Sequence, residues 1–387
     1  MMTNFFNAIG VADMERVHSA VIGWMLSEGC SVFNLETRSD IISTMFGLQP
    51  SRVFSQISVS VEVFDIDILI TTEDQNGKQE CWVIENKIKT NQHNNQLDKY
   101  VKIIAEKYKH IPEANRHFCL LTLIGEEPQG VFSQKWKNCT YNNLSSILEC
   151  AFKNGNTTHE HWIILNEYAK CIKELNEALS DFLKSPTSYE HVFTDGNKRK
   201  DEKDEQYLQN ISSKSGSHGR FISECGLETI FQKCYLGKEW DAYLKTTKKE
   251  YDWGISETRG NAALDIGYKM IKDTSKEEEY NTQVEFQNGT FKIQITPSKD
   301  NNISRDEFFK KWEESFNKKK KDLNKNIKGK KPKWRVNCSR SNNNNRYISL
   351  SLQVEKWWAE QNLWTLIDTC ENLLKKLIAE GNCVTIP

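Results

Sequence analysis

The stretch FDIDILITTEDQNGKQECWVIENK, residues 64–87, predicts a β-hairpin around which the first half of the chain is organised. Two apolar runs, DIDILI and ECWVIENK, flank a polar segment that contains Asn76-Gly77. Asn-Gly between apolar runs is the strongest short-range signal for two antiparallel strands joined by a tight turn. We therefore expect the segments around Asp67 and Glu85 to lie on neighbouring strands.

The same stretch places acidic and basic side chains near the strand ends. Side chains alternate between the two faces of a strand, so Glu85 and Lys87 share one face and Asn86 lies on the other. By the same rule Asp65 and Asp67 share a face. Two carboxylates that meet across the hairpin repel each other unless a hard divalent cation lies between them, and oxygen ligands suit Mg²⁺ or Mn²⁺. A lysine beside that cation can orient an attacking water.

This D…E-x-K arrangement resembles the PD-(D/E)XK nuclease superfamily. It resembles most closely the branch whose strand ends in I-E-N-K, here Ile84–Lys87, and leads into a helix bearing Q-x-x-x-Y, which Gln96 and Tyr100 match. The leading Pro of the superfamily is absent, because Ile66 precedes Asp67. The resemblance covers roughly residues 10–180. It implies an α/β restriction-endonuclease-like core, with a mixed central sheet flanked by helices.

The resemblance also implies roles for individual residues. Asp67, Glu85 and the main-chain carbonyl of Asn86 would hold Mg²⁺ (or Mn²⁺), and Lys87 would position and polarise the water. The remaining catalytic candidates are the helical pair Gln96 and Tyr100, which would line the site and orient the substrate backbone.

A helix is expected at residues 13–28, with Asp13 as its N-cap. The resemblance places a further metal-site glutamate on this helix, and Glu15 occupies that position. The alternative is a first-turn glutamate that complements the helix dipole. His18 is expected to be a packed or capping histidine rather than a ligand.

The choice of the metal-binding aspartate depends on how the preceding strand ends. Residues 53–63 alternate apolar and polar side chains, but no Gly, Pro or Asn separates them from DIDILI. Either a tight turn forms near Glu62–Asp65 or one long strand bends. We favour Asp67 because an apolar run follows it, with Asp65 and Glu62 as the reserve candidates.

The remaining patterns divide the chain into three parts. A helix at about residues 91–109, a buried strand at 116–125 and two helices within 140–183 complete a nuclease-like domain, residues 1–183. Residues 184–220 are predicted to be a polar linker with some helical tendency. Residues 221–387 form a C-terminal α+β domain with a hairpin at Asn288-Gly289. In that domain Asp265 and Glu285-x-Gln287 mimic the nuclease spacing, but no lysine follows, so we regard this match as accidental.

Charge is distributed unevenly along the chain. Residues 1–195 carry 17 Lys and Arg against 25 Asp and Glu, whereas residues 310–346 carry 14 against 3. A basic surface of that strength favours contact with phosphates. The candidate nucleic-acid-binding residues are Lys318, Lys319, Lys320, Lys321, Lys325, Lys328, Lys330, Lys331, Lys333 and Arg335.

Composition excludes several other classes of protein. No apolar run reaches the length of about 18 residues that a membrane helix needs, and the N-terminus lacks the pattern of a signal peptide. We therefore expect a cytoplasmic protein. The 11 cysteines include no C-x-x-C pair, so neither a zinc site nor a disulfide framework is indicated.

These features favour a Mg²⁺-dependent nuclease that hydrolyses DNA, with a role in prokaryotic restriction or anti-phage defence implied by the resemblance. One alternative is a catalytically idle nuclease fold that only binds DNA. Another is an RNA-directed or effector-gated nuclease, whose C-terminal domain senses a ligand. The expected partners are DNA, with RNA as the alternative, and either a second copy of the chain or a defence-system protein.

Overall fold

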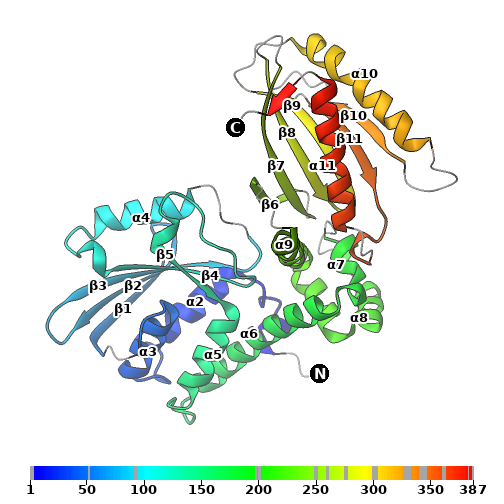
Figure 1. Cartoon of the computed structure of the whole chain (residues 1–387). Helices are drawn as coiled ribbons and strands as arrows, with labels where there is room; N and C mark the ends of the chain where they lie inside the picture. The colour runs from blue at the N-terminus through cyan, green and yellow to red at the C-terminus, as the bar shows by residue number, and fades with distance from the viewer. Residues whose placement is uncertain are drawn as a thin grey trace. The chain divides into compact units, whose positions relative to one another are not determined.

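The structure is a computed structural model that describes residues 4–50, 53–90, 92, 95–196, 198, 202–247, 252–258, 261–273, 278–298, 304–325, 333–339, 347–359, 363–381 and 383–385. The chain forms two compact units. The first comprises Met1–Ser185 and Arg199–Phe231, and the second comprises Pro186–Lys198 and Gln232–Pro387. Each unit is built around one β-sheet (Figure 1).

The first unit contains a five-stranded sheet in the order β1-β2-β3-β4-β5. Strands β1, β2 and β3 pair antiparallel, whereas β3, β4 and β5 pair parallel. The strands are β1 (Phe54–Val63), β2 (Ile66–Asp74), β3 (Gln79–Lys87), β4 (Arg116–Thr122) and β5 (Trp136–Thr140). This mixed sheet with flanking helices confirms the expected restriction-endonuclease-like core.

A tight turn, rather than one long bent strand, joins β1 to β2. Val63 pairs with Ile66, which leaves a loop of two residues, and Phe64 and Asp65 have φ of 58° and 62°. Positive φ at both central positions matches the twist of a tight β-hairpin. Glycine and asparagine usually occupy such positions, so their absence here concealed the turn in the sequence.

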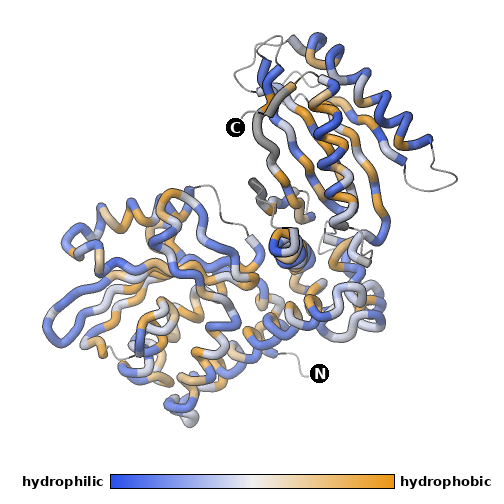
Figure 2. The backbone as a smooth tube through the Cα atoms, in the orientation of Figure 1, coloured by the Kyte–Doolittle hydropathy of each residue, from blue (hydrophilic) through white to orange (hydrophobic). Residues whose placement is uncertain are grey.

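The apolar residues of the hairpin alternate between two helical layers. Leu69 and Val83 pack with Tyr100 and Ile104 of α4 (Gln96–Lys107) on one face. The opposite face is covered by α2 (Glu15–Leu26) and α3 (Leu35–Met45). Figure 2 shows hydrophobic residues along the strands between these layers, with polar residues on the outer faces of the helices.

Several boundaries differ from the sequence expectation. Asp13 is not the N-cap of α2; Met14 occupies that position, and Asp13 instead pairs with Lys89. Helix α4 begins at Gln96 rather than near residue 91. Strand β5 was not expected, because WKNCT is short and largely polar. The helices α5 (Tyr141–Phe152) and α6 (His161–Lys184) lie where two helices were predicted.

The segment interpreted as a polar linker contains helical structure. It includes α7 (Glu190–Thr194) and most of α8 (Glu205–Cys225). Leu208 and Ile211 of α8 are buried in the first unit although the segment is polar overall. A few apolar residues at helical spacing are therefore sufficient to dock this helix.

The second unit contains a seven-stranded sheet, in which β10-β11-β9-β8-β7-β12 form one path and β6 pairs with β7. Its hairpin at Asn288-Gly289 is confirmed, since Gln287 pairs with Thr290 and both turn residues have positive φ. The strands are β6 (Asp252–Thr258), β7 (Asn261–Asp273), β8 (Glu279–Gln287), β9 (Thr290–Pro297), β10 (Arg335–Ser339), β11 (Tyr347–Gln353) and β12 (Cys383–Thr385). Helices α10 (Arg305–Asn324) and α11 (Leu363–Glu380) cover one face of this sheet.

Helix α9 (Glu228–Thr247) was not expected from the sequence. Within the described ranges, no helix is both long enough and apolar enough for a membrane span.

The second unit also explains the accidental match. Asp265 lies directly opposite Glu285, but both oxygens of Asp265 accept hydrogen bonds, from Ser256 and Gln283, at 2.7 Å each. Glu285 forms an ion pair with Lys292. Because both carboxylates already have partners, this cluster is a polar network on a sheet face.

Candidate active site

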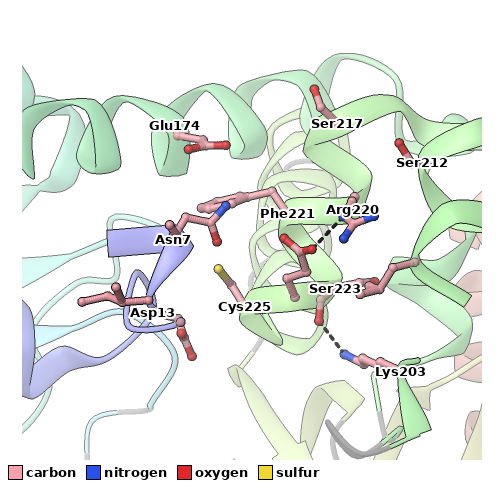
Figure 3. A pocket seen from close by; sticks show the side chains of 15 residues that line it. Asn7, Asp13, Glu174, Lys203, Ser212, Ser217, Arg220, Phe221, Ser223 and Cys225 are labelled. Carbon is pink, nitrogen blue, oxygen red and sulfur yellow. Dashed lines mark hydrogen bonds and ion pairs between the residues drawn. The ribbon is translucent and has the colours of Figure 1, made fainter. Parts of the chain in front are cut away.

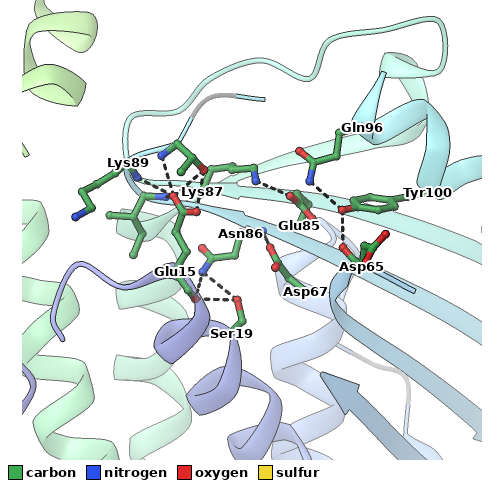
Figure 4. Close-up of polar contacts among 12 residues, drawn as sticks. Glu15, Ser19, Asp65, Asp67, Glu85, Asn86, Lys87, Lys89, Gln96 and Tyr100 are labelled. Carbon is green, nitrogen blue, oxygen red and sulfur yellow. Dashed lines mark hydrogen bonds and ion pairs between the residues drawn. The ribbon is translucent and has the colours of Figure 1, made fainter. Parts of the chain in front are cut away.

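The register of the β2–β3 hairpin brings the two predicted carboxylates together. Ile68 pairs with Ile84, so Asp67 and Glu85 face each other at the next position, on the α4 side of the sheet. Asp67 Oδ2 also accepts a hydrogen bond of 2.7 Å from the backbone N–H of Asn86. Figure 4 shows both side chains at the end of the hairpin, with Gln96 and Tyr100 beside them.

Glu85 and Lys87 form a buried ion pair. Lys87 Nζ lies 2.7 Å from Glu85 Oε1, and the side chains are 9% and 1% exposed. The other oxygen, Glu85 Oε2, is buried and accepts no hydrogen bond from a donor in the described residues. The Asp67 carboxyl is close enough to hydrogen-bond with Glu85 when one of the two is protonated. Burial and the neighbouring charge of Asp67 raise the pKa of Glu85 to about 8. The positive charge of Lys87 is therefore not sufficient to keep the pKa of Glu85 at its ordinary value.

The two candidate aspartates lie in different environments. Burial raises the pKa of Asp67 above its usual range, while the Asn86 N–H opposes that shift. Asp65 lies in the β1–β2 turn, where its side chain is 78% exposed and pairs with Lys99 at 2.7 Å. The geometry therefore favours Asp67 as the site residue.

The Q-x-x-x-Y residues lie on the first turns of α4. Gln96 Nε2 donates to the Tyr100 hydroxyl at 2.8 Å, and that hydroxyl donates to the main-chain oxygen of Asp65 at 2.5 Å. Gln96 Oε1 is buried, and no residue among those that the structure describes donates a hydrogen bond to it. Burial and the charge of Glu85 raise the pKa of Tyr100, so its hydroxyl remains a donor. These bonds join α4 to the turn that precedes Asp67.

Glu15 holds the chain where it leaves β3. Its Oε1 accepts hydrogen bonds from the backbone N–H groups of Ile88, Lys89 and Thr90 at 2.8, 2.9 and 2.9 Å. The Thr90 hydroxyl donates to both carboxylate oxygens. These donors lower the pKa of Glu15 despite its burial.

The side chain of Asn86 points to the opposite face of the sheet, as strand alternation requires. Asn86 Nδ2 donates to the main-chain oxygen of Glu15 at 3.0 Å and to Ser19 Oγ at 3.2 Å, and its Oδ1 accepts from the Tyr141 hydroxyl. Only main-chain groups of Asn86 are therefore directed towards the carboxylates. Ser19 and Tyr141 could not be predicted as partners of Asn86 from the sequence, because no local pattern links residues so far apart in the chain.

His18 is a packed residue, as expected. Its Nε2 donates to the main-chain oxygen of Ala12 at 2.9 Å, and its Nδ1 accepts from the Tyr168 hydroxyl at 3.1 Å. This tautomer follows from the partners, since a carbonyl can only accept. Burial lowers the pKa of His18 to about 4, so the ring is neutral at pH 7.

The predicted phosphate-binding residues belong to the second unit. On α10, Lys318 and Lys321 are exposed, whereas Lys319 pairs with Glu380 at 2.5 Å. Lys320 is half-buried. Lys325, Lys333 and Arg335 are exposed. Lys328, Lys330 and Lys331 lie outside the described residues.

The residues at the hairpin end fit a divalent metal ion. In the described part of the chain, no three or more His, Cys, Asp and Glu side chains form a metal-binding group. Asp67 and Glu85 supply two carboxylates, and Mg²⁺ commonly binds through one or two while it keeps several waters. Glu85 Oε2, which receives no hydrogen bond from the part of the chain that the structure describes, is a hard oxygen ligand available for such an ion.

The fold and the site together define a restriction-endonuclease-like domain. Residues 3–170 match the sequence model of the PD-(D/E)XK nuclease superfamily. This N-terminal part of the chain therefore belongs to the PD-(D/E)XK nuclease superfamily, whose members are usually metal-dependent nucleases. No curated protein and no solved structure gives a significant match to the chain.

Proposed function

We propose that this protein is a Mg²⁺-dependent nuclease that hydrolyses phosphodiester bonds of DNA. The observation that carries the proposal is the pair of facing carboxylates, Asp67 and Glu85, beside Lys87. One buried oxygen of Glu85 receives no donor from the described residues. Burying like charges in this way is unfavourable unless a cation completes the group. An idle binding module would have no need for that arrangement.

Asp67, Glu85 and the main-chain carbonyl of Asn86 would hold the metal ion. When bound, Mg²⁺ lowers the pKa of a coordinated water and offsets negative charge on the phosphate. Lys87 extends from the same face as Glu85, so its ammonium group can orient the attacking water and stabilise developing charge. Gln96 Oε1, a buried acceptor with no donor within the described ranges, can take a hydrogen bond from the water or the substrate.

Glu15 is the further metal-site glutamate that the resemblance implies. Its observed bonds favour a different role, because its Oε1 already accepts three backbone N–H groups. We propose that Glu15 fixes the exit of β3 and thereby the position of Lys87. Tyr100 has a similar positioning role through the Asp65 turn.

The basic residues of the second unit would attract the phosphates of the substrate. Lys318, Lys321, Lys325, Lys333 and Arg335 are exposed and available for this contact. DNA is the substrate that we favour, with RNA as the alternative, and a restriction or anti-phage role in the cytoplasm is consistent with such an activity.

A cleavage assay tests the proposal. The parent protein and Lys87→Ala are incubated with supercoiled DNA, linear DNA and RNA in Mg²⁺, Mn²⁺ or EDTA. We expect parent cleavage of DNA in either metal, none in EDTA, and none by the variant. Cleavage of RNA but not DNA would show that RNA is the substrate. Cleavage in EDTA would contradict the metal-dependent mechanism.

A further inference from the structure

The first unit contains a cavity of about 750 Å³ that the nuclease site does not use. The N-terminal segment, α6 and α8 surround it, and Figure 3 shows their side chains directed towards the shared space. This volume lies within the range of sites that hold small organic ligands. Apolar residues, including Ala8, Ile9 and Leu208, line part of the wall beside charged groups.

Helix α8 forms its wall by folding back on itself. Arg220 Nη1 and Nη2 donate to the two oxygens of Glu205 at 2.8 and 2.9 Å. Fifteen residues of continuous helix would separate them by about 22 Å. The chain reverses at Gly216, whose φ of 69° and ψ of −166° lie outside the helical region. The two arms thus make a hairpin, and residues of both arms line one side of the open cavity.

The cations of the cavity wall already have partners. Arg220 also donates from Nε to Glu224 at 2.7 Å, and Lys203 pairs with Glu228 at 2.6 Å. The charged lining residues and their ion-pair partners comprise the carboxylates Asp13, Glu174, Glu205, Glu224 and Glu228 and the cations Lys89, Lys203 and Arg220. The lining itself has three carboxylates and two cations, and with the ion-pair partners the count is five to three. This excess of negative charge favours a positively charged ligand over an anion.

Glu174 is the carboxylate that most needs a further donor. It accepts a hydrogen bond of 2.5 Å from the Asn4 amide, and it has no cationic partner among the described ion pairs. Figure 3 shows its side chain entering the cavity from α6. An ammonium group placed here would form a charge-assisted hydrogen bond.

Asp13 connects the cavity with the segment that follows β3. Its carboxylate pairs with Lys89, whose Nζ also donates to the main-chain oxygen of Cys225 in the cavity wall at 3.2 Å. Lys89 lies two residues beyond Lys87, and its backbone is held by Glu15. A ligand amine that binds Asp13 must compete with Lys89.

We propose that this cavity is a binding site for a small organic amine, such as an aliphatic polyamine. Its ammonium groups bind Glu174 and Asp13, and its methylene chain packs against the apolar wall. The ligand displaces Lys89 from Asp13, so occupancy is linked to the segment that follows β3. The proposal does not depend on the proposed nuclease activity.

Isothermal titration calorimetry of the full chain, without nucleic acid or divalent metal, tests this site. The probe is spermidine, with 1,8-octanediol as an uncharged control and ATP as an anionic one. We expect saturable spermidine binding at one site and none of either control. Glu174→Gln should weaken binding roughly tenfold or more, as expected for the loss of one hydrogen bond to a charged group. Glu177→Gln, which changes an exposed glutamate of the same helix outside the cavity, should bind as the parent does.

Because the ligand competes with Lys89 for Asp13, a second variant is expected to bind more tightly rather than more weakly. Lys89→Met removes the competitor for Asp13 and should tighten spermidine binding several-fold. Lys170→Met removes an equal charge from a surface pair with Glu167 and should leave binding unchanged. Three results would each overturn the proposal: no saturable binding, parent-like binding by Glu174→Gln, or equal tightening by both lysine variants. Preferential binding of ATP would refute the inferred ligand class.

Discussion

The backbone N–H of Asn86 donates to Asp67 Oδ2 at 2.7 Å, and this bond ties the end of β3 to the start of β2. It orients Asp67 towards Glu85 on the α4 side of the sheet. The next residue, Lys87, returns to the same face and pairs with Glu85. The pairing register of the β2–β3 hairpin therefore positions the candidate site residues. Substitutions at this end of the hairpin should have distinct effects on cleavage and stability.

Lys87→Ala should reduce cleavage at least about 100-fold, the usual scale for loss of a group that positions a proton or water. The variant's unfolding temperature should lie closer to that of the parent with Mg²⁺ than without it, because the ion offsets the charge of Glu85. The control is Lys78→Ala, which removes an exposed lysine at the opposite end of the hairpin, paired with Glu80. Parent-like turnover of Lys87→Ala would exclude this residue from the mechanism.

Asp65→Asn should retain most of the activity, whereas Asp67→Asn should lose it. Asparagine tolerates the left-handed conformation of residue 65, and the main-chain oxygen that accepts from Tyr100 remains. Asp67→Asn removes a carboxylate from the proposed metal group. Initial cleavage rates at equal protein concentration compare the two. The reverse ranking would show that the site uses the turn rather than β2.

Mg²⁺ should raise the unfolding temperature of the parent protein but not that of Asp67→Asn. A ligand that binds only the folded state stabilises it by about 2.7 kcal/mol at 100 times its Kd. Calorimetric scans at matched ionic strength measure the effect, and Glu73→Gln at the far end of β2 is the control. Equal stabilisation of Asp67→Asn by Mg²⁺ would place the ion elsewhere.

Stability should fall as the pH decreases from about 6.5 to 4, in part because His18 is buried and neutral. Its pKa is lowered from 6.5 to about 4 on folding, so the unfolded state binds the proton more readily in that window. The loss approaches about 1.4 kcal/mol per pH unit. Urea unfolding of the parent, His18→Gln and the exposed-residue control His110→Gln measures it. A parent-like pH slope in His18→Gln would contradict this origin.

The salt dependence of DNA binding should identify the lysines that contact phosphates. Each contact contributes a slope of about −0.9 in log K against log salt. Lys318→Gln/Lys321→Gln should flatten the slope by about two units, because both side chains are exposed. Lys319→Gln is the matched control, since its ammonium group already pairs with Glu380. An unchanged slope in the double variant would mean that α10 is only a solvated surface.

Local signals were sufficient to identify the nuclease core. The Asn76-Gly77 turn, the alternating strands and the E-x-K and Q-x-x-x-Y spacings all act within a few residues, so the sequence alone predicts them. The α/β core and its superfamily are borne out. The roles of Asp67, Glu85 and Lys87 remain predictions.

Contacts between distant residues needed the tertiary structure. The tight turn at Phe64-Asp65 has no glycine or asparagine, so only strand pairing revealed it, and with it the different environments of Asp65 and Asp67. Glu15 accepts from backbone groups more than 70 residues away, and the reversal of α8 at Gly216 is visible only through Arg220 and Glu205. A sequence specifies short-range conformation through side-chain chemistry, whereas these contacts depend on how separate elements pack.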